Sequence, residues 1–158
     1  MNPDLLARDD RLRLPRYTTD AAPALIGFGA AAISAPPQGY ARNIAAVPAD
    51  ARMIEVGQVP TARGLALTPE DRLRRDVIER LTCDLRVDLD AVCARHAVGA
   101  AVFEPELARI DALCGEGLAR RVRGQVAGSA AARALVRVVA SVFDARLAGT
   151  AGTHAPAL

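Results

Sequence analysis

The residues able to do chemistry in this sequence are few, and their spacing limits what they can do. Three cysteines, Cys83, Cys93 and Cys114, stand 10 and 21 residues apart. This spacing fits neither a C-x-x-C metal pair nor a disulfide framework, so we expect three separate buried thiols. The two histidines, His96 and His154, have no partners at a metal-binding spacing. The sequence therefore predicts no metal site and no catalytic residue.

Residues 24–34 have a composition that is typical of a segment whose backbone lies close to a bound ligand. This run, ALIGFGAAAIS, is uncharged and has Gly27 and Gly29 one residue apart. Because glycine has no side chain, the backbone that carries it can approach a ligand closely. The continuous apolar pattern predicts a buried strand over 24–34, which the following Pro-Pro pair ends. For Tyr40 and Asn43, in the next segment, a turn is as good an explanation as a binding role.

The other predicted elements are mainly helices. We therefore expect an α+β fold that is mostly α. Residues 69–85 carry apolar side chains at every fourth position behind Thr68 and Pro69, which is typical of an amphipathic helix. Further helices are predicted over residues 48–56, 88–96 and 130–147, the last capped by Ser129, and over a segment from residue 104 that stops at Gly115 or Gly117. A hairpin is predicted over residues 118–128, with its turn at Arg123 and Gly124. Three helices, a hairpin and a closing helix predict a winged-helix-like unit.

Composition excludes several classes of protein. Hydrophobic residues make up 51% of the 158 residues and charged residues 24%, which is typical of a folded globular chain. The net charge of +2 gives no electrostatic reason to expect nucleic acid or an anionic membrane as a partner. No apolar run reaches the roughly 18 residues of a membrane span, and the charged N-terminus is unlike a signal peptide. We therefore expect a cytoplasmic protein without membrane contacts.

A winged-helix-like unit raises an alternative function, a free-standing module that binds nucleic acid or a protein. The exposed arginines expected to be available for phosphate contacts are Arg72, Arg74, Arg75 and Arg80 in the helix and Arg120, Arg121 and Arg123 in the hairpin. The same helix also carries carboxylates, and two of them stand four residues before an arginine, Asp71 before Arg75 and Asp76 before Arg80, a spacing at which such side chains pair. A solvated, self-paired face explains the pattern better, so we do not expect nucleic acid as a partner.

Four stretches follow one another in the order of a known family, almost without gaps. They are YTTDAAPALIGFGAAAIS at 17–34, GYARN at 39–43, RGLALTPEDRLRRDVIERLTCDLRVDL at 63–89, and the Phe143–Asp144 pair. Together they resemble the C-terminal third of the oxygen-independent coproporphyrinogen III oxidases, which are radical S-adenosylmethionine enzymes. The resemblance implies a part in haem biosynthesis, where the family oxidatively decarboxylates two propionate side chains of coproporphyrinogen III to give protoporphyrinogen IX.

The resemblance also implies a division of the chain into four parts. Residues 1–16 are a disordered lead-in, and residues 17–63 are a remnant of the radical S-adenosylmethionine barrel, with its last strand and exit segment. Residues 64–147 are the helical C-terminal domain that covers the barrel mouth, and residues 148–158 are a disordered tail. The expected fold is thus the terminal strand of a partial β/α barrel followed by a winged-helix-like domain.

In this family the isoleucine of the glycine-containing run lines the S-adenosylmethionine pocket, and the matching residue here is Ile33. The family's [4Fe–4S] cluster needs a C-x-x-x-C-x-x-C loop, which this sequence lacks. Residues 14–16, Leu-Pro-Arg, also depart from the aromatic-Gln-Gly run that usually precedes Tyr-Thr-Thr. The resemblance therefore predicts a C-terminal fragment that is inactive alone and that has an N-terminal radical S-adenosylmethionine chain as a candidate partner.

Overall fold

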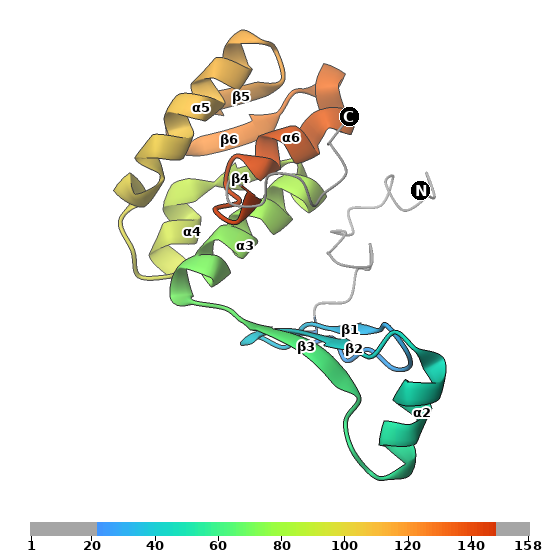
Figure 1. The fold of residues 1–158 in the computed structure, drawn as a ribbon. Helices are drawn as coiled ribbons and strands as arrows, with labels where there is room; N and C mark the ends of the chain where they lie inside the picture. Colours follow the sequence, from blue (N-terminus) through green and yellow to red (C-terminus); the bar gives the residue numbers. More distant parts are fainter. Residues whose placement is uncertain (1–21, 148–158) are drawn as a thin grey trace. The chain divides into compact units, whose positions relative to one another are not determined.

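The computed structural model describes residues 22–147, in two units. We call residues 22–68 the sheet unit and residues 69–147 the helical unit. Both combine helices with small antiparallel sheets, so the mixed α and β class expected from the sequence is confirmed (Figure 1). Within the described residues, no helix has both the length and the apolar character needed to cross a membrane.

The helical unit follows the predicted order of helices closely. Its elements are α3 (Pro69–Asp84), β4 (Arg86–Asp88), α4 (Leu89–Arg95), η1 (Ala100–Phe103), α5 (Glu104–Gly115), β5 (Ala119–Val122), β6 (Gln125–Gly128), η2 (Ala130–Leu135) and α6 (Val136–Ser141). The predicted helices over residues 69–85 and 88–96 are confirmed, and the helix expected to stop at Gly115 or Gly117 ends at Gly115. Asp88 caps α4 as predicted, because its Oδ1 accepts a hydrogen bond of 2.9 Å from the Ala91 backbone N–H.

The closing helix predicted over residues 130–147 differs from the structure. It is divided into the 3₁₀ helix η2 and the short α-helix α6, and the Ser129 side chain makes no capping hydrogen bond. Residues 130–135, which form the 3₁₀ helix, are alanine-rich, whereas the valines lie in the α-helical part, so helix propensity does not explain the division. Burial therefore matters more here than propensity, and Val136, Val139 and Phe143 all lie in the interior.

One hydrophobic core holds the helical unit together. The apolar stripe of α3 supplies Leu73, Val77 and Leu81, each at most 2% exposed. Phe103 and Phe143 are fully buried, and their rings meet edge to face with centroids 5.4 Å apart. The core therefore joins the start of this unit to its end.

The hairpin of the helical unit forms where it was predicted and gains a third strand. β5 and β6 pair antiparallel, and the turn is closed by Arg123 in the left-handed conformation, with φ of 54°. β4, which was not predicted, pairs with the other side of β6, so that Val87 lies opposite Val126, and both are buried. The sheet order is thus β4-β6-β5, with its apolar side chains in the core.

Arg74 is not the exposed residue that the sequence led us to expect. Its guanidinium donates hydrogen bonds to Glu106 Oε1 (2.6 Å), Glu70 Oε1 (2.8 Å) and the Phe143 carbonyl (3.3 Å), and lies 5.6 Å from the centre of the Phe103 ring. Burial alone acts to lower the pKa of Arg74, but the bonds to the two glutamates outweigh it and raise that pKa. Arg74 therefore links α3 to α5 and to Phe143, which follows α6.

The sheet unit is built from short strands and one helix. They are β1 (Ile33–Ser34), β2 (Gly39–Asn43), α2 (Val47–Glu55) and β3 (Thr61–Ala66), with the sheet order β1-β2-β3. The helix predicted over residues 48–56 is confirmed in α2, and Gly57 follows it in the left-handed conformation, with φ of 72°. β3 was not predicted, and all six of its residues are exposed.

Two predictions for the sheet unit were wrong. Residues 24–34 do not form one buried strand, because Gly29 (φ 90°) and Ala31 (φ 59°) reverse the chain and leave only residues 33–34 in β1. Residues 39–43 form the strand β2 and not a turn. The turn lies earlier, where the Gly39 N–H donates a 3.1 Å hydrogen bond to the Pro36 carbonyl, so the two prolines join β1 to β2.

Candidate functional site

The loop that precedes β1 is held by a buried amide. Asn43, which is 9% exposed, donates a hydrogen bond of 3.0 Å from Nδ2 to the Gly29 carbonyl. Its backbone N–H donates to the Ala32 carbonyl at 2.9 Å, and the Ala31 N–H donates to the Ile44 carbonyl at 2.9 Å. Three hydrogen bonds thus fix the reversal of the chain just before Ile33.

Gly27 lets the loop lie against the strand that carries Ile33. A Cβ added at Gly27 would lie only 2.6 Å from the Ile33 carbonyl oxygen, so no other residue fits there without a shift of the backbone. The Gly27 N–H also donates a 3.0 Å hydrogen bond to the Ser34 hydroxyl. The close approach that we expected of the glycines toward a ligand is therefore made, at Gly27, toward the protein's own backbone.

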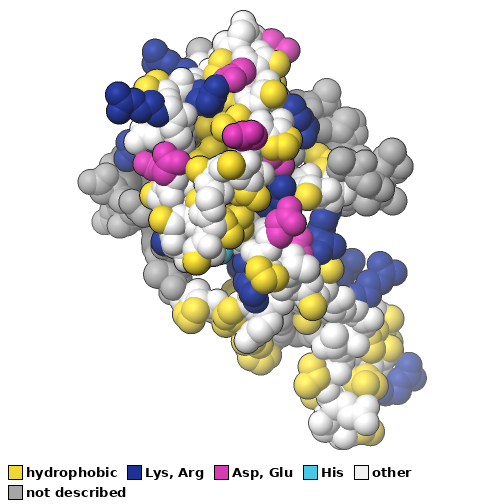
Figure 2. Space-filling view, turned by 90° about the vertical axis from the view of Figure 1, so that its left-hand side faces the viewer, with side chains coloured by type: hydrophobic (Ala, Val, Ile, Leu, Met, Phe, Trp, Pro, Cys, Tyr) yellow, Lys and Arg dark blue, Asp and Glu magenta, His cyan; other side chains and the backbone are white. Residues whose placement is uncertain are grey.

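The side chains of this loop point largely into solvent. Phe28 is 90% exposed, Ile26 60% and Ile33 50%. Hydrophobic side chains, drawn in yellow, are visible on the molecular surface in Figure 2. Folded proteins seldom leave such side chains uncovered together unless a ligand or partner covers them. Ile33 is thus held by a rigid backbone, with half of its surface available for contact.

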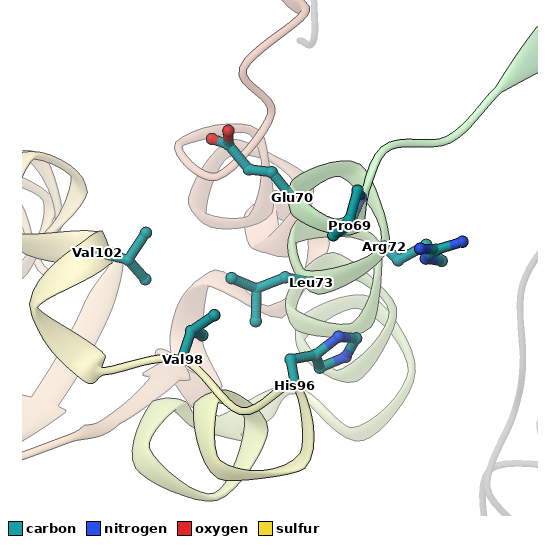
Figure 3. A pocket seen from close by; sticks show the side chains of 7 residues that line it. All are labelled: Pro69, Glu70, Arg72, Leu73, His96, Val98 and Val102. Atoms are coloured by element: carbon teal, nitrogen blue, oxygen red, sulfur yellow. The ribbon is translucent and has the colours of Figure 1, made fainter.

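A cleft of about 440 Å³ opens in the helical unit at the start of α3 (Figure 3). It is lined by Pro69, Glu70, Arg72, Leu73, His96, Val98 and Val102. Leu73, Val98 and Val102 face a common space, whereas Arg72 points away from it. The polar side chains at its rim are engaged, since Glu70 binds Arg74 and His96 Nε2 lies 3.3 Å from Asp76 Oδ2. The lining offers an apolar surface and no activated nucleophile.

Asp76 is the centre of a charged cluster beside this cleft. Arg80 Nε donates to its Oδ1 at 2.9 Å, which confirms the predicted pair, and Arg95 donates to its Oδ2 at 2.8 Å. Burial alone acts to raise the pKa of Asp76, but the bond from Arg95 and the charges of Arg80 and Arg95 lower it overall. The cluster ties α3 to the end of α4 and leaves these arginines neutralised.

The cysteines do not come together. No disulfide joins them, and Cys93 is buried, which together with the Asp90 charge raises the pKa of its thiol. Within residues 22–147, no three side chains of His, Cys, Asp or Glu gather in a way that could hold a metal ion. The thiols present therefore do not fit an iron–sulfur cluster. Of the other residues considered from the sequence, residues 17–19 and His154 lie outside the described part of the chain.

Comparison with known proteins gives consistent results in sequence and in structure. The chain is 41% identical over 131 residues to the oxygen-independent coproporphyrinogen III oxidase of Bradyrhizobium diazoefficiens, and 38% identical over 141 residues to that of Cereibacter sphaeroides. These alignments cover 83% and 88% of this chain but 29% and 31% of the relatives. No protein-family model matches the chain.

The solved structure of coproporphyrinogen III oxidase from Escherichia coli, a radical S-adenosylmethionine enzyme, matches with a TM-score of 0.76 and 30% identity. The match covers 82% of this chain and 30% of that one. The fold is therefore that of a portion of a radical S-adenosylmethionine enzyme. More narrowly, the chain is homologous to the C-terminal portion of the oxygen-independent coproporphyrinogen III oxidases, which confirms the resemblance seen in the sequence.

Two residues that shape these sites escaped the sequence analysis. Asn43 was noted only as a turn residue, and Arg74 only as one exposed arginine among several. Asn43 is the last residue of β2, and its side chain bonds to Gly29, which is 14 residues away, so no local pattern could show its role. Arg74 depends on Glu106, which is 32 residues away, so no local spacing could reveal the pair.

Proposed function

We propose that this chain serves as the C-terminal portion of an oxygen-independent coproporphyrinogen III oxidase and completes a catalytic site that the rest of such an enzyme carries. The parent reaction is the oxidative decarboxylation of coproporphyrinogen III to protoporphyrinogen IX. The chain spans about three tenths of the length of its relatives, so the remaining part would supply the cluster-binding loop. On its own, the chain would not catalyse the reaction.

Ile33 is the residue that we propose for contact with S-adenosylmethionine. It fits this role because its side chain is half exposed while Gly27, Ser34 and Asn43 hold the backbone around it. An apolar side chain on a fixed strand can cover the face of an adenine ring. When bound, S-adenosylmethionine would supply the radical chemistry of the family. This chain would contribute one wall of the pocket and exclude water there.

The finer features of the fold belong to the same proposal. We propose that residues 17–63 are the end of a partial β/α barrel and that residues 64–147 are a winged-helix-like cover. The order of helix, strand, helix, helix and hairpin, with β4 added to the hairpin sheet, supports the second assignment. Arg74, Arg80 and Arg121 each engage a carboxylate, which argues against a surface for nucleic acid. A cytoplasmic location stays a prediction.

A chimera tests the proposed function. The corresponding C-terminal part of the Escherichia coli relative is replaced by this chain, and formation of 5′-deoxyadenosine and of protoporphyrinogen is measured under anaerobic conditions. We expect turnover by the chimera and none by the isolated chain. Loss of both products in a chimera that folds and carries its cluster would contradict the proposal.

A matched pair of variants of the chimera tests the role proposed for Ile33. Ile33→Ala should raise the S-adenosylmethionine concentration needed for half-maximal rate about tenfold, because the buried contact of a large aliphatic side chain is worth about 1.5–3 kcal/mol. Ile54→Ala is the control, since Ile54 is 58% exposed on α2. Equal behaviour of the two variants would remove Ile33 from the pocket.

A further inference from the structure

The register of the sheet unit aligns three side chains across its strands. Ile33 of β1 lies opposite Arg42 of β2, and Arg42 lies opposite Arg63 of β3. Directly opposed residues of antiparallel strands project from the same face of a sheet, with their Cβ atoms about 4.5–5.5 Å apart. The three residues therefore form a row on one face, with the two arginines side by side next to Ile33.

Within residues 22–147, these two arginines have no counter-charge paired with them. Both are exposed, and neither has an ion pair or a side-chain hydrogen bond among the described residues. The carboxylates of the sheet unit within this part of the chain are Asp50, which is buried, and Glu55, at the end of α2. Like charges directly opposite each other destabilise a pair of strands. A sheet that keeps such a pair favours an external anion.

The same face also offers an apolar surface beside the arginines. Because side chains alternate along a strand, Tyr40 projects on the face of Arg42, and Leu65 on the face of Arg63. Tyr40 lies opposite Leu65 in the register, and Leu65 is 39% exposed. The face thus combines two fixed cations with an apolar floor.

We propose that Arg42 and Arg63 bind a carboxylate group of a ligand that rests on this face, namely a propionate side chain of the tetrapyrrole substrate. Planar guanidinium groups bind carboxylates through paired hydrogen bonds, and two of them side by side suit a molecule that carries several carboxylates on an apolar ring. The identity of the tetrapyrrole rests on the proposed function. The binding of a carboxylate does not rest on that function. Because S-adenosylmethionine also carries a carboxylate, the experiment must distinguish it from the tetrapyrrole.

Binding of coproporphyrin III to the whole chain tests the proposal directly. This stable tetracarboxylic porphyrin is titrated by fluorescence against the unaltered chain, Arg42→Met, Arg63→Met and the double variant. Loss of one charge-assisted contact should weaken binding about tenfold, and the double variant should bind more weakly than either single variant. Arg52→Met is the control, because Arg52 is an exposed arginine of the same unit on α2. The tetramethyl ester of coproporphyrin III, which has no carboxylates, should bind equally to all variants.

A stability measurement separates a binding role from a structural one. The double variant removes two like charges that face each other, so it should unfold at the same temperature as the unaltered chain or higher. A lower unfolding temperature would mean that the arginines support the fold, and it would overturn the binding role proposed for them.

The remaining outcomes decide the source of the carboxylate. If only S-adenosylmethionine binding weakens in the double variant, the tetrapyrrole assignment is overturned. Equal loss in Arg52→Met, or no binding of coproporphyrin III by the unaltered chain, overturns the site itself. The chimera assay tests the proposed function separately. Full turnover by a chimera that carries Arg42→Met and Arg63→Met would support the proposed function and would reject this binding site.

Discussion

The helical unit encloses its large apolar side chains, whereas the sheet unit leaves most of its own in solvent. Among the described residues, the buried hydrophobic side chains lie between Leu73 and Phe143, with Ala35 as the exception from the sheet unit. Phe103 and Phe143 are fully buried, while Phe28 is 90% exposed. The helical unit thus has the core of a domain able to fold by itself.

Charged residues differ between the units in the same way. In the helical unit Arg74, Arg80 and Arg121 are each paired with a carboxylate, but in the sheet unit Arg42 and Arg63 face each other. Exposed apolar side chains add little stability and like charges facing each other lower it, and both features persist where a ligand or partner uses them. The contrast indicates that the sheet unit is the part shaped for contact.

The largest expected effect compares one phenylalanine from each unit. Phe143→Ala should lower the free energy of unfolding by about 3–5 kcal/mol, because it removes a fully buried ring and leaves a cavity. Phe28→Ala should change it by less than about 0.5 kcal/mol, since the ring is in solvent. Chemical denaturation of the two variants measures the difference. Similar values for both would remove the contrast between the units.

A smaller effect should follow from the charged cluster of the helical unit. The pKa of Asp76 lies below its ordinary 3.8 in the folded state, so its contribution to stability is complete above the unfolded pKa. It is lost as the pH falls through the lowered folded value. Arg80, Arg95 and His96 face this carboxylate.

Asp76→Asn should therefore cost about 1 kcal/mol at pH 7 and reduce the loss of stability toward acid pH. Denaturant unfolding at pH 7 and at several values below pH 4 measures both effects. Glu116→Gln, at an exposed position after α5, is the control and should keep the acid dependence of the unaltered chain. An unchanged acid dependence in Asp76→Asn would contradict the role of the cluster.

The smallest effect should be confined to the sheet unit. Asn43→Ala removes the hydrogen bond to the Gly29 carbonyl, which is worth about 1 kcal/mol, so amides of residues 29–32 should exchange about fivefold faster. Hydrogen exchange measured by mass spectrometry should show no change in α3 or α5. Gln58→Ala, at an exposed position of the same unit, should leave the exchange unchanged. Faster exchange throughout the helical unit would mean that the two units are coupled.

Elements with strong local signals were predictable from the sequence. The apolar stripe of α3, the Asp88 cap of α4 and the Arg123–Gly124 turn each depend on residues within a few positions of one another. The strands β2, β3 and β4 were missed because a short strand is defined by its partner, and these segments carry no clear alternation of apolar residues. The prediction for residues 24–34 was wrong for the same reason. Their composition is that of a buried strand, but burial depends on neighbouring segments that the composition does not specify.

The sequence by itself determined the relatives of this protein, the helices of its second unit and the residue Ile33 as a candidate contact. Only the tertiary structure decided that Gly27 packs on the Ile33 backbone, that Arg74 pairs with Glu106, and that Arg42 and Arg63 stand opposite each other. The reason is physical: helix and turn preferences act over a few residues, whereas register and burial depend on residues far apart in the chain.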